Sequence, residues 1–166
     1  TCKIFNLSHL DEEKSFKKPL AVLSSHSDQI IGCWFLSQTN LISIGKDGSC
    51  HFWSKATVSQ PLEKEWFLHE KWFFNPQRSI PVSCASLSAS GNGKTFLLCI
   101  AFANSSFSLY ELAKETATAQ WTHVEIHSLT LTNPNNAHAS PSPSISTLAL
   151  SPGGGDWIAV ASPGNL

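Results

Sequence analysis

Short apolar runs recur along the whole chain, and Gly, Asn, Ser and Pro separate them. Helical spacing of apolar residues is almost absent, so this pattern predicts many short strands rather than helices. We expect three series of strands. The first series lies near residues 2–6, 20–23, 30–36, 41–44 and 49–53, the second near 82–87, 96–101, 106–112 and 124–129, and the third near 145–150 and 157–161.

The strand series contain an internal repeat. Residues 41–53 align without gaps on residues 98–110, so that apolar positions, the turn and the final aromatic residue all match. Residues 1–5 align in the same way on residues 49–53. Three strands that end in an aromatic residue therefore recur at Phe5, Trp53 and Tyr110, which is typical of a protein built from repeated β-units.

Residues 25–53 are the most informative segment. His26 precedes a predicted strand, Ser43 lies on the next strand, Asp47 begins an Asp-Gly turn, and Trp53 ends the following strand. This arrangement resembles a WD repeat. The resemblance implies that the four side chains form one hydrogen-bonded set, which is stable only when every member has a partner. It also implies the fold class: an all-β WD-repeat β-propeller fragment with about two complete four-stranded blades and parts of two neighbours.

The domain organisation follows from the repeat length. Propeller repeats usually span ~40–45 residues, and the spacing here is wider, so we expect insertions. Residues 56–71 and 132–144 are polar and are the predicted inserted loops of one propeller that covers residues 1–166. The second of these stretches is rich in Pro and Ser and has few apolar residues, which predicts a mobile loop. The chain does not begin with Met, and we expect it to come from the middle of a longer protein.

A nucleophilic triad is the alternative interpretation of the same Ser, His and Asp. No Gly-x-Ser-x-Gly turn is present to expose a serine. The pair Asp47-Gly48 is instead typical of a hairpin turn. We therefore expect a structural set, no catalytic residue and a protein that is not an enzyme.

Two further patterns suggest a metal or a phosphate and are better explained otherwise. His123 and His127 are four residues apart, which suits a metal on a helix, but such positions on a strand stand roughly 13 Å apart. The run Gly153-Gly154-Gly155 lacks the Lys and Ser or Thr of a phosphate-binding loop. We therefore expect no metal site and no cofactor.

The charge content predicts no overall positive field, and it leaves room for a local basic patch. Charged residues make up 14% of the chain, and the formal net charge is −1, so no overall field would attract nucleic acid or an anionic membrane. For the small cluster of Lys14, Lys17 and Lys18 we expect a solvated loop, with contact to RNA phosphates as the alternative. No run of about 18 apolar residues occurs, so we expect no membrane-spanning helix.

The cysteines predict a reducing compartment. Their number is odd, no two form a Cys-x-x-Cys pair, and each lies in an apolar or strand-like run. We expect buried, reduced thiols in the cytosol or nucleus rather than a disulfide framework. The five are Cys2, Cys33, Cys50, Cys84 and Cys99.

An aromatic cluster leaves two interpretations open. Its density suits packing in the core, and it also suits a partner surface, because exposed aromatic patches mark docking sites. The cluster consists of Trp66, Phe67, Trp72, Phe73 and Phe74.

A narrower resemblance rests on four stretches: residues 1–5, residues 43–48 together with Trp53, residues 71–75 (Lys-Trp-Phe-Phe-Asn) and residues 155–159 (Gly-Asp-Trp-Ile-Ala). In this order they resemble the periodic tryptophan protein family. The resemblance implies a non-catalytic scaffold of the small-subunit processome in the nucleolus of the nucleus. Such a scaffold acts in ribosome biogenesis, in pre-rRNA processing and 18S rRNA maturation.

The implied partners are other WD-repeat processome proteins, pre-rRNA and the U-three small nucleolar ribonucleoprotein, with no membrane and no small-molecule substrate. The alternative is a WD-repeat adaptor of another complex, such as a ubiquitin-ligase receptor or a trafficking coat.

Overall fold

The computed structural model describes residues 1–5, 19–56, 66–74, 80–91, 94–114, 120–131, 145–154 and 156–162. In these residues twelve β-strands form four antiparallel sheets, and no helix occurs. The same residues therefore contain no helix that is long and apolar enough to cross a membrane.

Two four-stranded sheets lie between two two-stranded ones. Within each sheet, the strands follow one another in chain order. The N-terminal hairpin consists of β1 (Cys2–Ile4) and β2 (Ala21–Leu23). The first four-stranded sheet consists of β3 (Ile30–Phe35), β4 (Asn40–Gly45), β5 (Ser49–Lys55) and β6 (Trp66–Phe73). The second consists of β7 (Val82–Ala89), β8 (Thr95–Phe102), β9 (Ser106–Ala113) and β10 (Thr122–Thr130). The last sheet consists of β11 (Thr147–Leu150) and β12 (Ile158–Ala161).

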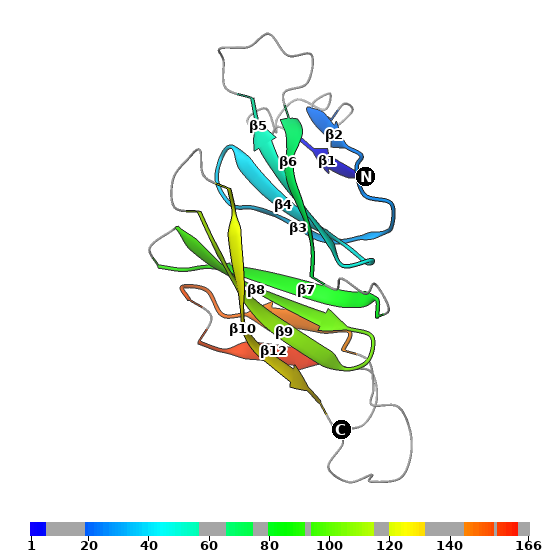
Figure 1. The fold of residues 1–166 in the computed structure, drawn as a ribbon, viewed down its shortest axis with the longest axis vertical. Helices are drawn as coiled ribbons and strands as arrows, with labels where there is room; N and C mark the ends of the chain where they lie inside the picture. The colour runs from blue at the N-terminus through cyan, green and yellow to red at the C-terminus, as the bar shows by residue number, and fades with distance from the viewer. Residues whose placement is uncertain are drawn as a thin grey trace, which may run out of the picture.

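In Figure 1, the N-terminal hairpin and the first four-stranded sheet lie in the upper half of the view, and the second four-stranded sheet and β12 lie in the lower half. The first strands of the last three sheets meet, because β3 contacts β7 and β7 contacts β11, whereas the hairpin contacts the first four-stranded sheet through β2 and β6. Three apolar clusters fill the spaces between successive sheets. Phe52 and Leu98 belong to the central cluster, Leu23 and Leu41 to the cluster under the hairpin, and residues such as Leu148 to the last.

The two four-stranded sheets follow one plan. Leu41 pairs with Trp53 in the first sheet, and Leu98 pairs with Tyr110 in the second. These are the positions that the sequence alignment matched. Both sheets also carry a bulge in their first strand and another in their last strand. The repeated sequence pattern therefore corresponds to repeated strand pairing.

All the strands predicted from the sequence overlap observed strands, but the loop predicted over residues 56–71 is wrong at its C-terminal end. Trp66 begins β6, which pairs with β5 along its length. The pattern concealed this strand because the polar run of His69, Glu70 and Lys71 interrupts its apolar residues. Residues 57–65, residues 132–144 and the lysines at 14, 17 and 18 lie outside the described residues.

The cysteines differ from expectation in one respect. All five are free thiols, but Cys33 is exposed and Cys84 is only half-buried.

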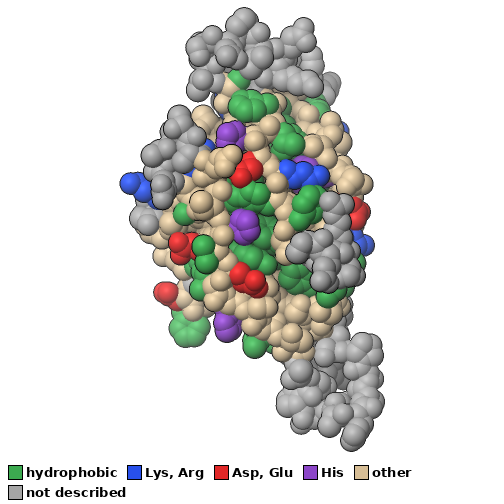
Figure 2. Space-filling view, viewed as in Figure 1, with side chains coloured by type: hydrophobic (Ala, Val, Ile, Leu, Met, Phe, Trp, Pro, Cys, Tyr) green, Lys and Arg blue, Asp and Glu red, His purple; other side chains and the backbone are tan. Residues whose placement is uncertain are grey.

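The face of the molecule in Figure 2 shows apolar side chains along its middle and scattered charges of both signs, without a concentrated basic area.

Candidate functional site

A buried hydrogen-bond network ties the segment before β3 to β4 and β5. The Trp53 Nε1–H donates to the Ser43 hydroxyl at 2.8 Å. The same hydroxyl lies 2.7 Å from His26 Nε2, and His26 Nδ1 lies 3.0 Å from the Ser49 hydroxyl. Three of the four residues predicted as a set are therefore joined directly.

Asp47 joins the network through Ser49 rather than through the histidine. Asp47 lies in the turn between β4 and β5, where Gly48 has the positive φ of 77° that favours glycine. One carboxylate oxygen accepts from the Ser49 N–H at 3.0 Å, and the other accepts from the Ser27 hydroxyl at 3.2 Å. The Ser49 hydroxyl bonds to the same carboxylate. Sequence reasoning missed Ser49, whose only signal was its place directly after the Asp-Gly turn.

One arrangement of protons satisfies every member of the network. Trp53 donates to Ser43, the Ser43 hydroxyl donates to His26 Nε2, His26 Nδ1–H donates to Ser49, and the Ser49 hydroxyl donates to the Asp47 carboxylate. This arrangement requires a neutral histidine with its proton on Nδ1. The network then runs in one direction from a buried indole to an ionised carboxylate.

The electrostatics agree with this arrangement. Burial lowers the pKa of His26, although the Asp47 carboxylate opposes the effect. Burial alone would raise the pKa of Asp47, but hydrogen bonds from Ser49 and Ser27 outweigh it and hold this pKa below its usual value. Near neutral pH, the histidine is therefore uncharged and the carboxylate is ionised.

His51 lies beneath the network and was not singled out from the sequence. Its ring stacks on His26 with centroids 3.7 Å apart and an interplanar angle of 8°. The residue is 0% exposed, and neither ring nitrogen has a hydrogen-bond partner. Burial, followed by the neighbouring His26, lowers the pKa of His51 to about 4. No feature of the sequence distinguishes this histidine, because its stacking depends on the pairing of β4 with β5.

Gly45 provides the space that the network occupies. A Cβ at this position would stand 2.6 Å from Asp47 Oδ1, 2.8 Å from Ser49 Oγ and 2.9 Å from His26 Nδ1. These distances are too short for any side chain, so glycine is needed here for close approach.

The geometry differs from that of a nucleophilic triad. In a triad, the acidic residue bonds directly to the histidine, and the serine faces the substrate. Here Ser49 separates Asp47 from His26, and Ser43 is 0% exposed. The described part of the chain also contains no group of three His, Cys, Asp or Glu side chains that could hold a metal ion.

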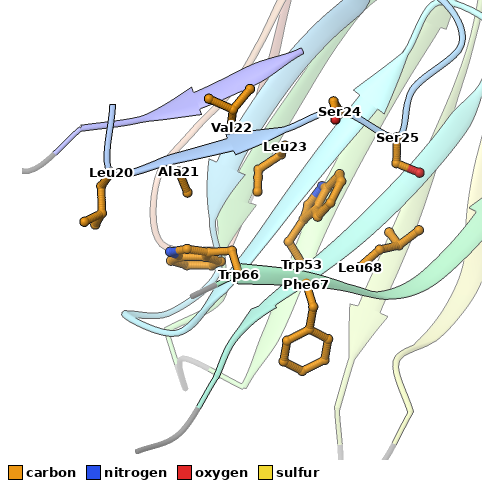
Figure 3. A pocket seen from close by; sticks show the side chains of 10 residues that line it. All are labelled: Leu20, Ala21, Val22, Leu23, Ser24, Ser25, Trp53, Trp66, Phe67 and Leu68. Carbon is orange, nitrogen blue, oxygen red and sulfur yellow. The ribbon is translucent and has the colours of Figure 1, made fainter. Parts of the chain in front are cut away.

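A pocket of about 460 Å³ adjoins the network, between the N-terminal hairpin and β6 (Figure 3). Trp53 belongs both to the network and to the pocket wall. None of the lining residues is titratable, and the polar ones among them are two serines and two tryptophans. The pocket is lined by residues 20–25, Trp53 and residues 66–68.

The predicted aromatic cluster is divided between two environments. Trp66 is buried under the hairpin, and Phe74 is buried between the four-stranded sheets. Trp72 is half-buried, packs on Phe52 at 4.4 Å between centroids and donates its indole N–H to a carboxylate. Phe67 is 41% exposed at the pocket, and Phe73 is half-buried. A partner surface formed by these residues stays a prediction.

The two histidines considered as metal ligands, His123 and His127, lie exposed on β10. The His123 ring packs on Trp72, with centroids 4.3 Å apart.

No model of a known protein family matches this chain, and no curated protein matches it either.

Proposed function

We propose that this chain is part of a WD-repeat β-propeller. Each four-stranded sheet is one blade, and the two-stranded sheets at either side belong to neighbouring blades. Three features support the proposal: strands that follow chain order within each sheet, contacts between the first strands of the last three sheets, and equivalent strand pairing in the two larger sheets. The hydrogen-bond network of His26, Ser43, Trp53 and Asp47, with Ser49 as its link, is the feature expected of a WD repeat.

The function that this arrangement supports best is a non-catalytic scaffold. The observation that carries it is the complete burial of Ser43, the hydroxyl at the centre of the only Ser-His-Asp set recognised in the described residues. A buried hydroxyl that already bonds to Trp53 and His26 holds strands together and cannot attack a substrate. The lining of the neighbouring pocket has no titratable side chain, and such a pocket suits contact with a partner better than chemistry.

We further propose that the protein acts in ribosome biogenesis as a subunit of the small-subunit processome. The support is the resemblance to the periodic tryptophan protein family in residues 71–75 and 155–159. Within the first of these stretches, Trp72 and Phe74 pack between the two blades. These aromatic residues therefore contribute to packing between the proposed blades. A stretch with such a packing role is one that related propellers would be expected to share. Fold alone does not determine function, so the test must be biochemical.

The test is to tag the full-length protein, purify it gently from its own cells and sequence the RNA that accompanies it. Cells without the tag provide the background. We expect enrichment of the U-three small nucleolar RNA and of the 5′ spacer of pre-ribosomal RNA, together with other WD-repeat proteins. If both RNAs are absent and a different protein complex is recovered intact, the processome role is wrong and a WD-repeat adaptor of that complex takes its place.

A further inference from the structure

Two thiols meet where the N-terminal hairpin covers the first four-stranded sheet. Cys2 lies on β1 and is buried in the same apolar cluster as Leu41 and Trp53. Cys33 lies on β3, directly opposite Ser43 of β4. Residues opposite each other in an antiparallel pair share a face, and so do residues two apart on a strand. Cys33 is therefore on the face that carries Leu41, which is the face that the hairpin covers.

The two side chains are near each other. Each thiol affects the protonation of the other, and both are reduced. Their exposure differs, because Cys2 is 9% exposed whereas Cys33 is open to solvent. A small reagent can thus reach Cys33 first, whereas Cys2 is buried in the apolar cluster.

This interaction separates the acidities of the two thiols. The neighbouring Cys2 lowers the pKa of the exposed Cys33 to about 6, and the neighbouring Cys33 together with burial raises the pKa of Cys2. Burial raises the pKa of Cys50, Cys84 and Cys99 instead, in the last case to about 12. An exposed thiolate beside a second thiol is the arrangement of a redox-reactive pair, whereas buried neutral thiols are inert.

We propose that Cys2 and Cys33 form a reversible disulfide that links β1 to β3 when the protein meets a hydroperoxide. The Cys33 thiolate attacks one peroxide oxygen, the O–O bond breaks, and Cys33 becomes a sulfenic acid. With hydrogen peroxide, the departing hydroxide takes up a proton and becomes water. The Cys2 sulfur then attacks the Cys33 sulfur, the S–S bond forms, the S–O bond breaks, and a second water leaves with the Cys2 proton. The two thiols lose two electrons and two protons, and the peroxide gains both.

The link would fasten the hairpin to the adjacent sheet. In the reduced protein, apolar packing of Cys2, Ile4 and Leu23 is what holds the described hairpin against that sheet. A disulfide between β1 and β3 closes a long loop and so restricts the unfolded chain more than a short loop would. Oxidation is therefore expected to make the hairpin harder to open. This inference does not depend on the proposed function.

The experiment treats the full-length protein with hydrogen peroxide, blocks the remaining thiols with an alkylating reagent and identifies linked peptides by mass spectrometry without reduction. We expect a peptide pair that joins Cys2 to Cys33 and disappears on treatment with dithiothreitol. Cys84→Ser is the matched control, because Cys84 is half-buried outside the pair and serine can still donate to the Ile145 carbonyl. That variant should form the link as the wild type does.

The variants Cys2→Ser and Cys33→Ser should not form the link. In Cys2→Ser, the Cys33 sulfenic acid has no partner and should accumulate, where dimedone can trap it. The proposal is overturned if dimedone labels Cys33 in the wild type while no linked pair forms, or if peroxide leaves Cys33 unmodified. It is also overturned if Cys33 appears only in links between two molecules. Because each readout can be made on the wild-type protein, the test stands even if a variant fails to fold.

Discussion

Ser43 is the residue on which the hydrogen-bond network depends most. Its hydroxyl accepts from Trp53 and bonds to His26, and it has no exposed surface through which water could replace either partner. A buried polar group that loses its partner costs more free energy than its hydrogen bond contributed, because it is not returned to water.

We predict that Ser43→Ala lowers the stability of β4 and β5 by about 1–3 kcal/mol, since it leaves the Trp53 N–H without an acceptor. Native-state hydrogen exchange of the amides in these strands, in the full-length protein, measures this loss. Ser54→Ala is the control, because the partly buried Ser54 hydroxyl donates only to Asn40 outside the network. Equal losses of stability in Ser43→Ala and Ser54→Ala would show that the network does not add to the stability of these strands.

His51 makes the first four-stranded sheet sensitive to acid. Its pKa is lowered from 6.5 to about 4 in the fold, so the unfolded chain binds a proton at a higher pH than the native protein does. Stability is therefore complete above about pH 6.5 and is lost as the pH falls towards about 4, by an amount on the order of 3 kcal/mol. His26, whose pKa is also lowered, acts in the same direction.

We predict that His51→Phe reduces this acid sensitivity while the stability near neutral pH changes little. Phenylalanine can keep the stacking on His26 and removes two buried nitrogens that have no partners. The measurement is the thermal unfolding midpoint across this pH range. The same substitution at the exposed His69 is the control and should leave the pH dependence as in the wild type. If the unfolding midpoint of His51→Phe changes with pH as steeply as that of the wild type, His51 is not the cause of the acid sensitivity.

At the scale of the elements, the edge strand β6 connects the two four-stranded sheets, although its sequence did not predict a strand. Its Glu70 carboxylate accepts from the Trp72 indole at 2.6 Å and from the Trp121 backbone N–H at 3.2 Å, which joins the two four-stranded sheets. Phe52 packs between Trp72 and Trp121, with centroid distances of 4.4 and 5.3 Å. The aromatic residues of three segments thus form one contact between sheets.

We predict that Phe52→Ala loosens this contact and lowers stability by about 3–5 kcal/mol, because a large buried ring is replaced by a cavity. Phe52 is 1% exposed, whereas Phe67 on the same sheet is 41% exposed, so Phe67→Ala should cost about 1 kcal/mol or less. Thermal unfolding and hydrogen exchange in β5 and β9 distinguish the two. Similar losses of stability in Phe52→Ala and Phe67→Ala would show that Phe52 is not central to the contact between the two sheets.

At the scale of the whole molecule, the described residues leave apolar surface and sheet edges uncovered. Every residue of β10 is exposed, including Val124, Ile126 and Leu129, and Trp157 is 78% exposed. Open edges and apolar patches of this kind are sites for association with another chain.

We therefore predict that residues 1–166 produced alone associate or aggregate, and that Val124→Lys reduces this association because a charge on an edge strand discourages pairing. Analytical ultracentrifugation and light scattering provide the measurement. A monomer that melts cooperatively would contradict the prediction and would show that these sheets are sufficient for a stable fold.

The sequence by itself determined the parts of this protein that depend on neighbouring residues. The alternation of apolar runs and turns predicted the inner strands, the Asp47-Gly48 pair predicted the hairpin between β4 and β5, and the repeat matched Trp53 with Tyr110. These features arise from local conformational preference and from burial on a regular period, and both can be read along the chain.

Only the tertiary structure decided what depends on packing between distant segments. The insertion of Ser49 between Asp47 and His26, the stacking of His51 and the proximity of Cys2 and Cys33 are set by strand register and by the way sheets lie on one another. Edge strand β6 was hidden for a related reason. The apolar ends of β6 are interrupted by the polar residues His69, Glu70 and Lys71, so the strand carries little periodic signal, and its pairing with β5 is what makes it a strand.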